Sequence, residues 1–261
     1  MAKRFAAKKS FRRYGWVPGN KAPMHFFDVP HMAVLPSSVD LRNNCPAIYD
    51  QGNLGSCTAN AAAGLAQYMM IKQKLPSWMP SRLALYYWNR LQEGTVSWDS
   101  GASLYDAMNT MVVYGVPHET LWPYNVRKFT TKPPKNVWSD AYWHSIQKGL
   151  SVRQNLNTIK ATLAAGNPII FGFTVYESFE SNTVTTTGIM PMPSEGEETL
   201  GGHAVMAVGY DDETQMIIVR NSWGTSWGQN GYFMMPFDFI TNPNYCDDFW
   251  TATTWVRFKK T

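Results

Sequence analysis

Apolar residues recur every three or four positions in three segments of the first half of the chain. This spacing predicts helices over approximately 57–74, 81–90 and 104–112, because each helix then turns one apolar face to the core. Pro76 sets the end of the first helix, since the residue before a proline disfavours the helical conformation. Ser81 is a suitable N-terminal cap for the second. The first half is therefore predicted to be mainly helical.

The second half has a different pattern, with short apolar and β-branched runs between turn residues. A short helix is expected over 157–166, with Asn157 as its cap and Gly166 as its stop. Strands are expected over 168–176, 203–210, 216–221 and 231–235. The tracts 183–187 and 195–198 have the composition of surface loops. Together these elements predict an α+β chain of 261 residues, long enough for one large domain or two lobes that share a cleft.

The first 34 residues differ from the rest in charge and in backbone restraint. They hold seven Lys or Arg residues and one Asp, a net charge of +6, whereas the remainder carries −2. Glycines and prolines between residues 11 and 36 forbid a long helix and predict an extended arm. Basic residues interrupt every short apolar group, so no secretory signal is predicted, and no apolar run approaches the roughly 18 residues that indicate a membrane span.

The three cysteines are too few for a disulfide framework. Cys45 and Cys246 are the pair that a disulfide could join while Cys57 stays free, but sequence alone does not show whether they approach. The low count favours a reducing compartment.

The stretch 50–65 carries the most specific chemistry. Glycine, asparagine and serine residues precede Cys57, which opens a run of small helix-favouring residues. This order predicts a loop that delivers a thiol to a helix N-terminus, where the helix dipole favours the nucleophilic thiolate. The alternative is a buried, inert cysteine packed under the helix.

Two later segments and one glutamine favour the interpretation of Cys57 as a catalytic nucleophile. The residues concerned are Gln51, Gly55-Ser56-Cys57, Gly202-His203-Ala204 and Asn221-Ser222-Trp223-Gly224. In identity and order they resemble the papain family of cysteine peptidases, in its disulfide-poor form found in microbes and large viruses. The histidine follows the cysteine by 146 residues, inside the roughly 130–150 of that family, and the asparagine follows it by 164.

The resemblance implies a papain-like two-lobe fold and a role for each matching residue. A helical lobe, about 35–145, would have its central helix begin at the nucleophile Cys57, and a β-barrel-like lobe, about 146–261, would carry His203 and Asn221. His203 would act as general acid and base, and Asn221 would orient its ring. Gln51 and the Cys57 backbone amide would form the oxyanion hole.

Substrate contacts are also carried over from the family. Gly101 and Ala102 match the pair that binds substrate backbone as an added strand. Gly201, Gly202 and Trp223 would lie beside the substrate, with Trp223 shielding the histidine–asparagine hydrogen bond from water. The alternative for Gly101 and Ala102 is an ordinary helix-capping loop.

Two positions depart from the family pattern. Leu54 stands where a half-cystine is expected, and Thr58 replaces the aromatic residue that normally follows the nucleophile. The missing half-cystine favours an intracellular or virion-associated protein.

The resemblance covers approximately residues 35–255, so residues 1–34 stand where a propeptide would be. Family propeptides run through the cleft in the non-productive direction and block it. The alternatives are a flexible basic tail, or an electrostatic tether to nucleic acid or an anionic surface.

The expected activity is hydrolysis of peptide bonds, as an endopeptidase, without a cofactor. The alternatives are a catalytically idle protein that keeps the fold, and a transpeptidase or ligase that uses the same thiol. No spacing of cysteines and histidines indicates a metal site. The histidines outside the motif, His25, His31, His118 and His144, are expected to be structural or exposed. The turn-rich segment 115–124 is expected to link the two lobes.

Overall fold

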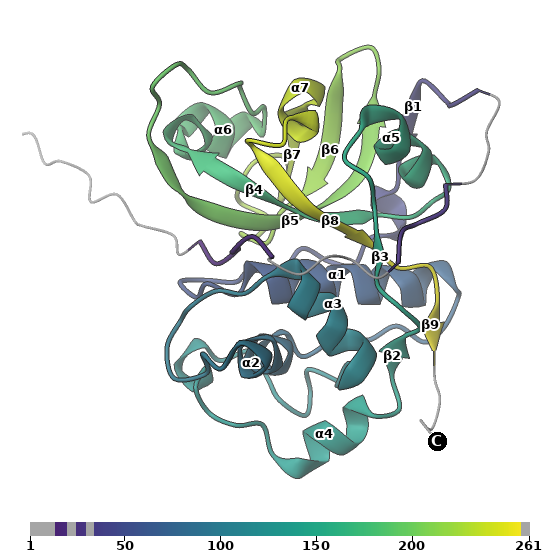
Figure 1. The fold of residues 1–261 in the computed structure, drawn as a ribbon, viewed down its shortest axis with the longest axis vertical. Coiled ribbons are helices and arrows are strands. Elements are labelled where there is room, and N and C mark those ends of the chain that lie inside the picture. The colour runs from purple at the N-terminus through teal and green to yellow at the C-terminus, as the bar shows by residue number, and fades with distance from the viewer. Residues whose placement is uncertain (1–13, 20–24, 30–33, 257–261) are drawn as a thin grey trace, which may run out of the picture.

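The computed structural model describes residues 14–19, 25–29 and 34–256. Figure 1 shows a helical lobe below and a sheet lobe above, with residues 14–19 between them. The helical lobe contains α1 (Cys57–Lys72), α2 (Arg82–Glu93), α3 (Leu104–Val113), α4 (Lys135–Ala141) and the strand pair β2 (Ser145–Ile146) and β9 (Trp255–Val256). No helix in the described part of the chain has the length and apolar character needed to cross a membrane.

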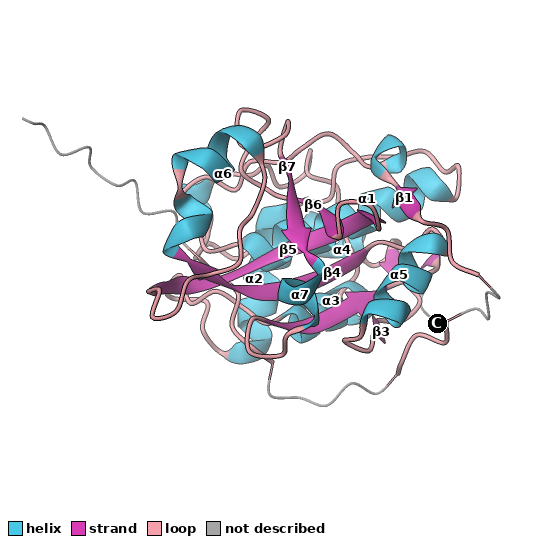
Figure 2. Cartoon of the chain, turned by 90° about the horizontal axis from the view of Figure 1, so that it is seen from above, coloured by secondary structure: helices cyan, strands magenta, loops and turns pink. Residues whose placement is uncertain are grey.

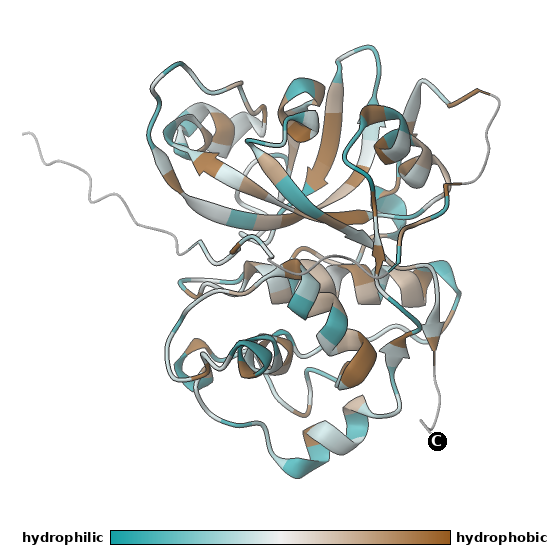
Figure 3. Cartoon of the chain, in the orientation of Figure 1, coloured by the Kyte–Doolittle hydropathy of each residue, from teal (hydrophilic) through white to brown (hydrophobic). Residues whose placement is uncertain are grey.

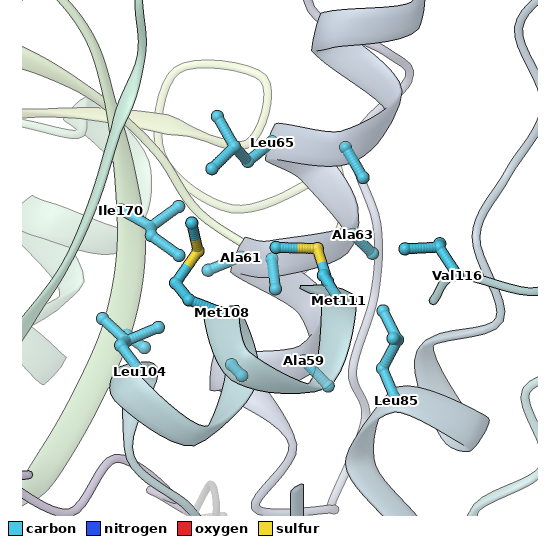
Figure 4. Close-up of a cluster of buried hydrophobic side chains, with 14 of the residues drawn as sticks. Ala59, Ala61, Ala63, Leu65, Leu85, Leu104, Met108, Met111, Val116 and Ile170 are labelled. Atoms are coloured by element: carbon cyan, nitrogen blue, oxygen red, sulfur yellow. The ribbon is translucent and has the colours of Figure 1, made fainter. Parts of the chain in front are cut away.

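α1 is the central helix because its small side chains allow close packing on several sides. It contacts α2, α3 and the sheet strand β5 (Thr199–Asp211). Figure 4 shows Ala59, Ala61 and Ala63 of α1 facing larger side chains, among them Met108 and Met111 of α3. Burial of these large side chains against alanines stabilises the lobe by the hydrophobic effect. The helix ends two residues earlier than predicted.

Serine caps begin the next two helices. The Ser81 side chain accepts a hydrogen bond from Ala84 N at 3.3 Å, which confirms its predicted role. Ser103 accepts one from Asp106 N at 3.0 Å at the start of α3. The loop before α3 is thus a capping loop. Its residues Gly101 and Ala102 also contact the N-terminal arm.

The sheet lobe is built on a seven-stranded sheet with antiparallel pairing. Its strand order is β3-β8-β4-β5-β6-β7, and β1 also pairs with β5. The strands are β1 (Ser38–Asp40), β3 (Leu150–Ser151), β4 (Ile169–Tyr176), β5, β6 (Met216–Arg220), β7 (Tyr232–Pro236) and β8 (Cys246–Thr251). The four predicted strands are confirmed as β4 to β7. The helices α5 (Leu156–Ala164), α6 (Asn182–Thr187) and α7 (Phe237–Thr241) lie in the same lobe, as Figure 2 shows from above.

Successive residues of β4 and β5 point to opposite faces of the sheet, and both faces are buried. Ile170, Ala204 and Met206 pack into the core shared with α1. Their neighbours Phe171 and Val205 point to the opposite face and join a second core with α5 and α7. The central strands are therefore apolar over most of their length, as Figure 3 shows.

Three predictions about local structure were wrong. The cap of α5 is Asn155, whose side chain accepts from Thr158 N at 2.9 Å, and not Asn157. The polar tract at 183–187 forms most of α6, where the Ser181 side chain caps Val184 N. The segment 115–124 does not link the lobes: it packs in the helical lobe, where Ser81 N donates to Pro117 O.

A buried ion pair fixes the loop that precedes α1. The side chains of Arg82 and Glu119, 8% and 15% exposed, are joined at 2.6 and 3.0 Å. The same guanidinium donates to Asp50 O at 3.2 Å.

We expect Arg82→Met to lower the free energy of unfolding by about 3–5 kcal/mol, because it leaves the Glu119 carboxylate without its buried partner. Urea denaturation measures the change. The exposed pair of Arg42 with Asp40, whose side chains are 41% and 45% exposed, provides the control. Arg42→Met should cost less than about 1 kcal/mol, and equal effects of the two variants would contradict the assignment.

Candidate active site

Four segments converge where α1 meets the sheet. Cys57 is the first residue of α1, His203 lies on β5, and Asn221 follows the last residue of β6. The loop that contains Gln51 is hydrogen-bonded to the segment that follows β6. Gln51 N donates to Ser222 O at 2.9 Å, and Gly224 N donates to Tyr49 O at 3.0 Å. Pairing of the loop with the segment after β6 therefore brings the four predicted residues together.

His203 and Asn221 form a buried hydrogen-bonded pair. The distance from His203 Nε2 to Asn221 Oδ1 is 2.8 Å, and the two residues are 0% and 2% exposed. The Trp223 ring stacks on the imidazole, with centroids 4.7 Å apart and planes at 27°. Because Asn221 Oδ1 only accepts, Nε2 carries a proton, and the lone pair of the neutral ring is on Nδ1.

Gln51 is held at both ends of its side-chain amide. Its Nε2 donates to Leu54 O at 3.0 Å, and its Oε1 accepts from Ser222 Oγ at 2.7 Å. The side chain is 1% exposed. These bonds orient the amide within the loop that ends at Cys57.

The Cys57 thiol is completely buried between α1, β5 and the N-terminal arm. Burial raises the pKa of this thiol to about 11, and hydrogen bonds from the backbone amides of Ala204 and Gly15 act against that rise. With residues 14–17 in place, the cysteine is thus a protonated thiol at neutral pH.

We expect this raised pKa to make stability fall in alkali. A thiol that ionises near pH 9 when unfolded, but near pH 11 when folded, contributes its stability fully below pH 9 and loses it as the pH rises to 11. The contribution is at most about 3 kcal/mol. Urea unfolding at pH 7, 9 and 10.5 under reducing conditions measures it. Cys57→Ala should show a smaller loss than the wild type, and parallel curves would contradict the assignment.

Residues 14–17 of the arm lie along the groove beside Cys57. Ala102 N donates to Gly15 O at 2.8 Å, and Val17 N donates to Ala102 O at 3.1 Å. On the other wall, Trp16 N donates to Gly202 O at 2.9 Å. The arm therefore pairs with both lobes, in the same direction as the strand-like segment at Ala102.

The Trp16 side chain fills a pocket in the sheet lobe. A Cβ on Gly172 would lie 1.9 Å from its ring, and a Cβ on Gly202 would lie 2.3 Å from its carbonyl oxygen. Trp16 is 7% exposed, and its Nε1 donates to Asp248 Oδ2 at 3.2 Å. The two glycines thus provide the space that the indole occupies.

Tyr14 lies by the histidine and Trp223. Its ring centroid is 6.2 Å from that of His203 and 6.4 Å from that of Trp223. A Cβ on Gly201 would lie 2.9 Å from Tyr14 Cβ, and the Tyr14 hydroxyl donates to Glu180. A Cβ on Gly101 would lie 2.2 Å from Gly15 O. The arm is therefore bordered by all five predicted substrate-binding residues: Gly101, Ala102, Gly201, Gly202 and Trp223.

Asp248 is a site residue that the sequence analysis did not identify. It has φ of +64°, and it accepts hydrogen bonds from Leu104 N at 2.8 Å and Trp250 Nε1 at 2.5 Å, besides that from Trp16. Burial raises the pKa of its carboxyl group. The sequence signal is an acidic pair, Asp247-Asp248, within the aromatic segment 245–250.

The departures from the family pattern have simple structural counterparts. All three cysteines are free, so Cys45 and Cys246 do not pair. Leu54 is buried in the apolar core of the helical lobe. Among the histidines outside the motif, His25 is exposed, His118 is half-buried and His144 is buried, whereas His31 lies outside the described residues.

Comparison with known proteins gives consistent matches. The family model described as papain family cysteine protease matches residues 35–247. An uncharacterized peptidase C1-like protein of Acanthamoeba polyphaga mimivirus is 41% identical over 233 residues, which are 86% of this chain and 73% of that protein. Procathepsin L of Felis catus is 29% identical over 234 residues, 84% of this chain and just under two thirds, 65%, of that protein.

Among solved structures, xylellain, a cysteine protease from Xylella fastidiosa, has a similar fold. It is 38% identical, its TM-score is 0.87, and the match covers 96% of this chain and 99% of that one. Its similarity extends over both lobes. The chain therefore belongs to the papain family of cysteine proteases.

Proposed function

We propose that this protein is an endopeptidase that hydrolyses peptide bonds through an acyl-enzyme on Cys57, with residues 35–261 as the peptidase domain. The observation that carries the proposal is the buried pair of His203 with Asn221, next to a cysteine at the N-terminus of α1. A nucleophile, a base, a group that orients the base and a held amide donor are the minimal parts of such a site.

Each residue has a defined role in the reaction. His203 takes the Cys57 proton through Nδ1, because Nε2 is engaged with Asn221 Oδ1 at 2.8 Å. The thiolate attacks the carbonyl carbon, and the oxyanion is stabilised by Gln51 Nε2 and the Cys57 amide. The imidazolium then protonates the leaving amine, and the neutral imidazole activates water for deacylation. Trp223, stacked on the imidazole, keeps water from the histidine–asparagine bond.

Substrate backbone would bind where the arm now lies. Ala102 offers a backbone donor and acceptor, and Gly202 offers an acceptor on the opposite wall. Both are used by an extended chain at residues 15–17, so the groove suits an extended peptide.

The arm is an inhibitor and not a substrate in this arrangement. A Gly15 amide N–H is turned to the Cys57 sulfur, while the Gly15 carbonyl oxygen accepts from Ala102 N at 2.8 Å. The Gly15 carbonyl oxygen is therefore engaged by Ala102 and is not offered to the oxyanion donors. Residues 1–34 would block the enzyme until the arm leaves the groove.

The test uses an epoxide thiol-protease inactivator and a fluorogenic peptide. We expect full-length protein to react slowly, and the Trp16→Ala chain to react quickly and to hydrolyse the peptide, with the adduct on Cys57 by peptide mass spectrometry. Cys57→Ala in the Trp16→Ala chain is the control and should show neither. A Trp16→Ala chain that is labelled at Cys57 but produces only ligated peptides would favour the ligase alternative. No adduct on Cys57 in either chain would favour the catalytically idle alternative.

A further inference from the structure

Two histidines and one aspartate meet at the end of the helical lobe. His118 comes from the segment between α3 and α4, Asp140 from the last turn of α4, and His144 from the residue before β2. One ligand atom from each lies within 4.8 Å of the other two. Figure 1 shows α4 at the end of the helical lobe farthest from the sheet.

Asp140 orients both imidazoles. Its Oδ2 lies 2.9 Å from His118 Nδ1, and its backbone carbonyl oxygen lies 3.0 Å from His144 Nδ1. A backbone carbonyl only accepts, so His144 Nδ1 carries a proton, and His144 would bind a metal ion through Nε2. His118 Nδ1 faces Asp140 Oδ2, so His118 would bind through Nδ1, and the ion would replace the proton between these two atoms.

The surrounding backbone holds these groups rigidly. His118 N also donates to Asp140 Oδ2, at 2.8 Å, and Val116 N donates to His144 O at 2.8 Å. A Cβ on Gly115 would lie 1.9 Å from Ala141 O, so the two segments approach as closely as glycine allows. Preorganised ligands of this kind reduce the entropy that metal binding would otherwise cost.

Aromatic rings cover the cluster without filling it. Trp78 stacks on His118 at 3.7 Å and meets His144 edge-on at 5.0 Å, and the two imidazoles are themselves 5.0 Å apart at 78°. The side chains of His118 and Asp140 remain 29% and 20% exposed. An ion and a water ligand therefore have access from solvent.

We propose that His118, Asp140 and His144 bind a divalent transition-metal ion, with Zn²⁺ as the ion that best suits the set. Imidazole nitrogens favour zinc, copper and nickel over calcium or magnesium, and two histidines with one carboxylate leave one tetrahedral position for water. Ligand atoms around Zn²⁺ are about 3.3 Å apart, so the cluster would contract slightly on binding. The ion would join α4 to the 115–124 segment in a chain whose cysteines are all free.

The experiment is titration of full-length protein with Co²⁺, followed by displacement with Zn²⁺. We expect one Co²⁺ per chain, visible d–d bands without thiolate charge transfer, and loss of the bands on addition of Zn²⁺. His118→Gln and His144→Gln should each weaken binding at least tenfold. His25→Gln, a matched change at an exposed histidine, should leave it unchanged.

A second measurement keeps the test valid where a variant fails to fold. In wild-type protein, Zn²⁺ should shift the NMR resonances of the His118 and His144 rings and leave those of His25 in place. Absence of saturable binding, thiolate charge transfer at one equivalent, or wild-type affinity in both His118→Gln and His144→Gln would overturn the proposal. The outcome does not depend on catalysis at Cys57.

Discussion

Trp16→Ala is expected to accelerate inactivator labelling of Cys57 about 10²–10⁴-fold in the full-length chain. Truncation of a buried tryptophan costs about 3–5 kcal/mol, and here that cost falls on the docked state of the arm alone. The Trp16 ring contributes the largest buried contact of residues 14–17 and the hydrogen bond to Asp248. Labelling rates at fixed inactivator concentration, read by peptide mass spectrometry, measure the effect.

Two further variants distinguish release of the arm from a general loss of packing in the protein. Val17→Ala is the control, because Val17 is 49% exposed and its contact with Ala102 is made by the backbone, so the rate should hardly change. Gly172→Ala should activate as Trp16→Ala does, since the new methyl group would occupy the position of the indole. Adding Trp16→Ala to Gly172→Ala should then give little extra. Slow labelling in both single variants would show that residues 14–17 do not limit access to the thiol.

Gln51→Ala, made in the Trp16→Ala chain, is expected to lower kcat by about 10²–10³ with little change in KM. Loss of one oxyanion donor costs about 2.7–4 kcal/mol in the transition state, where the negative charge develops. The Gln51 amide is held between Leu54 O and Ser222 Oγ, so its donor direction is set before substrate binds. Steady-state hydrolysis of a fluorogenic peptide measures the change.

Labelling of Cys57 supplies the control for this variant. A simple alkylating agent such as iodoacetamide reacts with the thiolate without forming a tetrahedral oxyanion, so its rate should stay within a few-fold of the parent. Ser222→Ala should lower kcat less, by about tenfold, because it loosens the amide without removing it. If Gln51→Ala slowed alkylation as much as hydrolysis, the residue would act on the nucleophile or on the fold of the loop instead.

Much of the fold was predictable because its signals are local. The helical spacing of apolar residues after Cys57, the serine before the second helix and the β-branched runs in the second half each act within one element. The cap of α5 was misassigned because Asn155 and Asn157 are both suitable caps, and tertiary packing selects the one that begins the helix. The strand β8 was missed because its polar Asp247 and Asp248 interrupt the apolar pattern.

The sequence by itself predicted the residues of the proposed reaction site: Cys57, His203, Asn221 and Gln51 occur in motifs whose residues are adjacent in the chain. Only the tertiary structure decided where residues 14–17 of the arm lie, because Trp16 and Asp248 are 232 residues apart and meet through pairing of β8 with β4. The same holds for His118 and Asp140, 22 residues apart, which meet because α4 packs against the 115–124 segment. Neighbours along the chain are specified by local backbone preferences. Contacts between distant segments are specified by the packing of the whole core, which no short pattern contains.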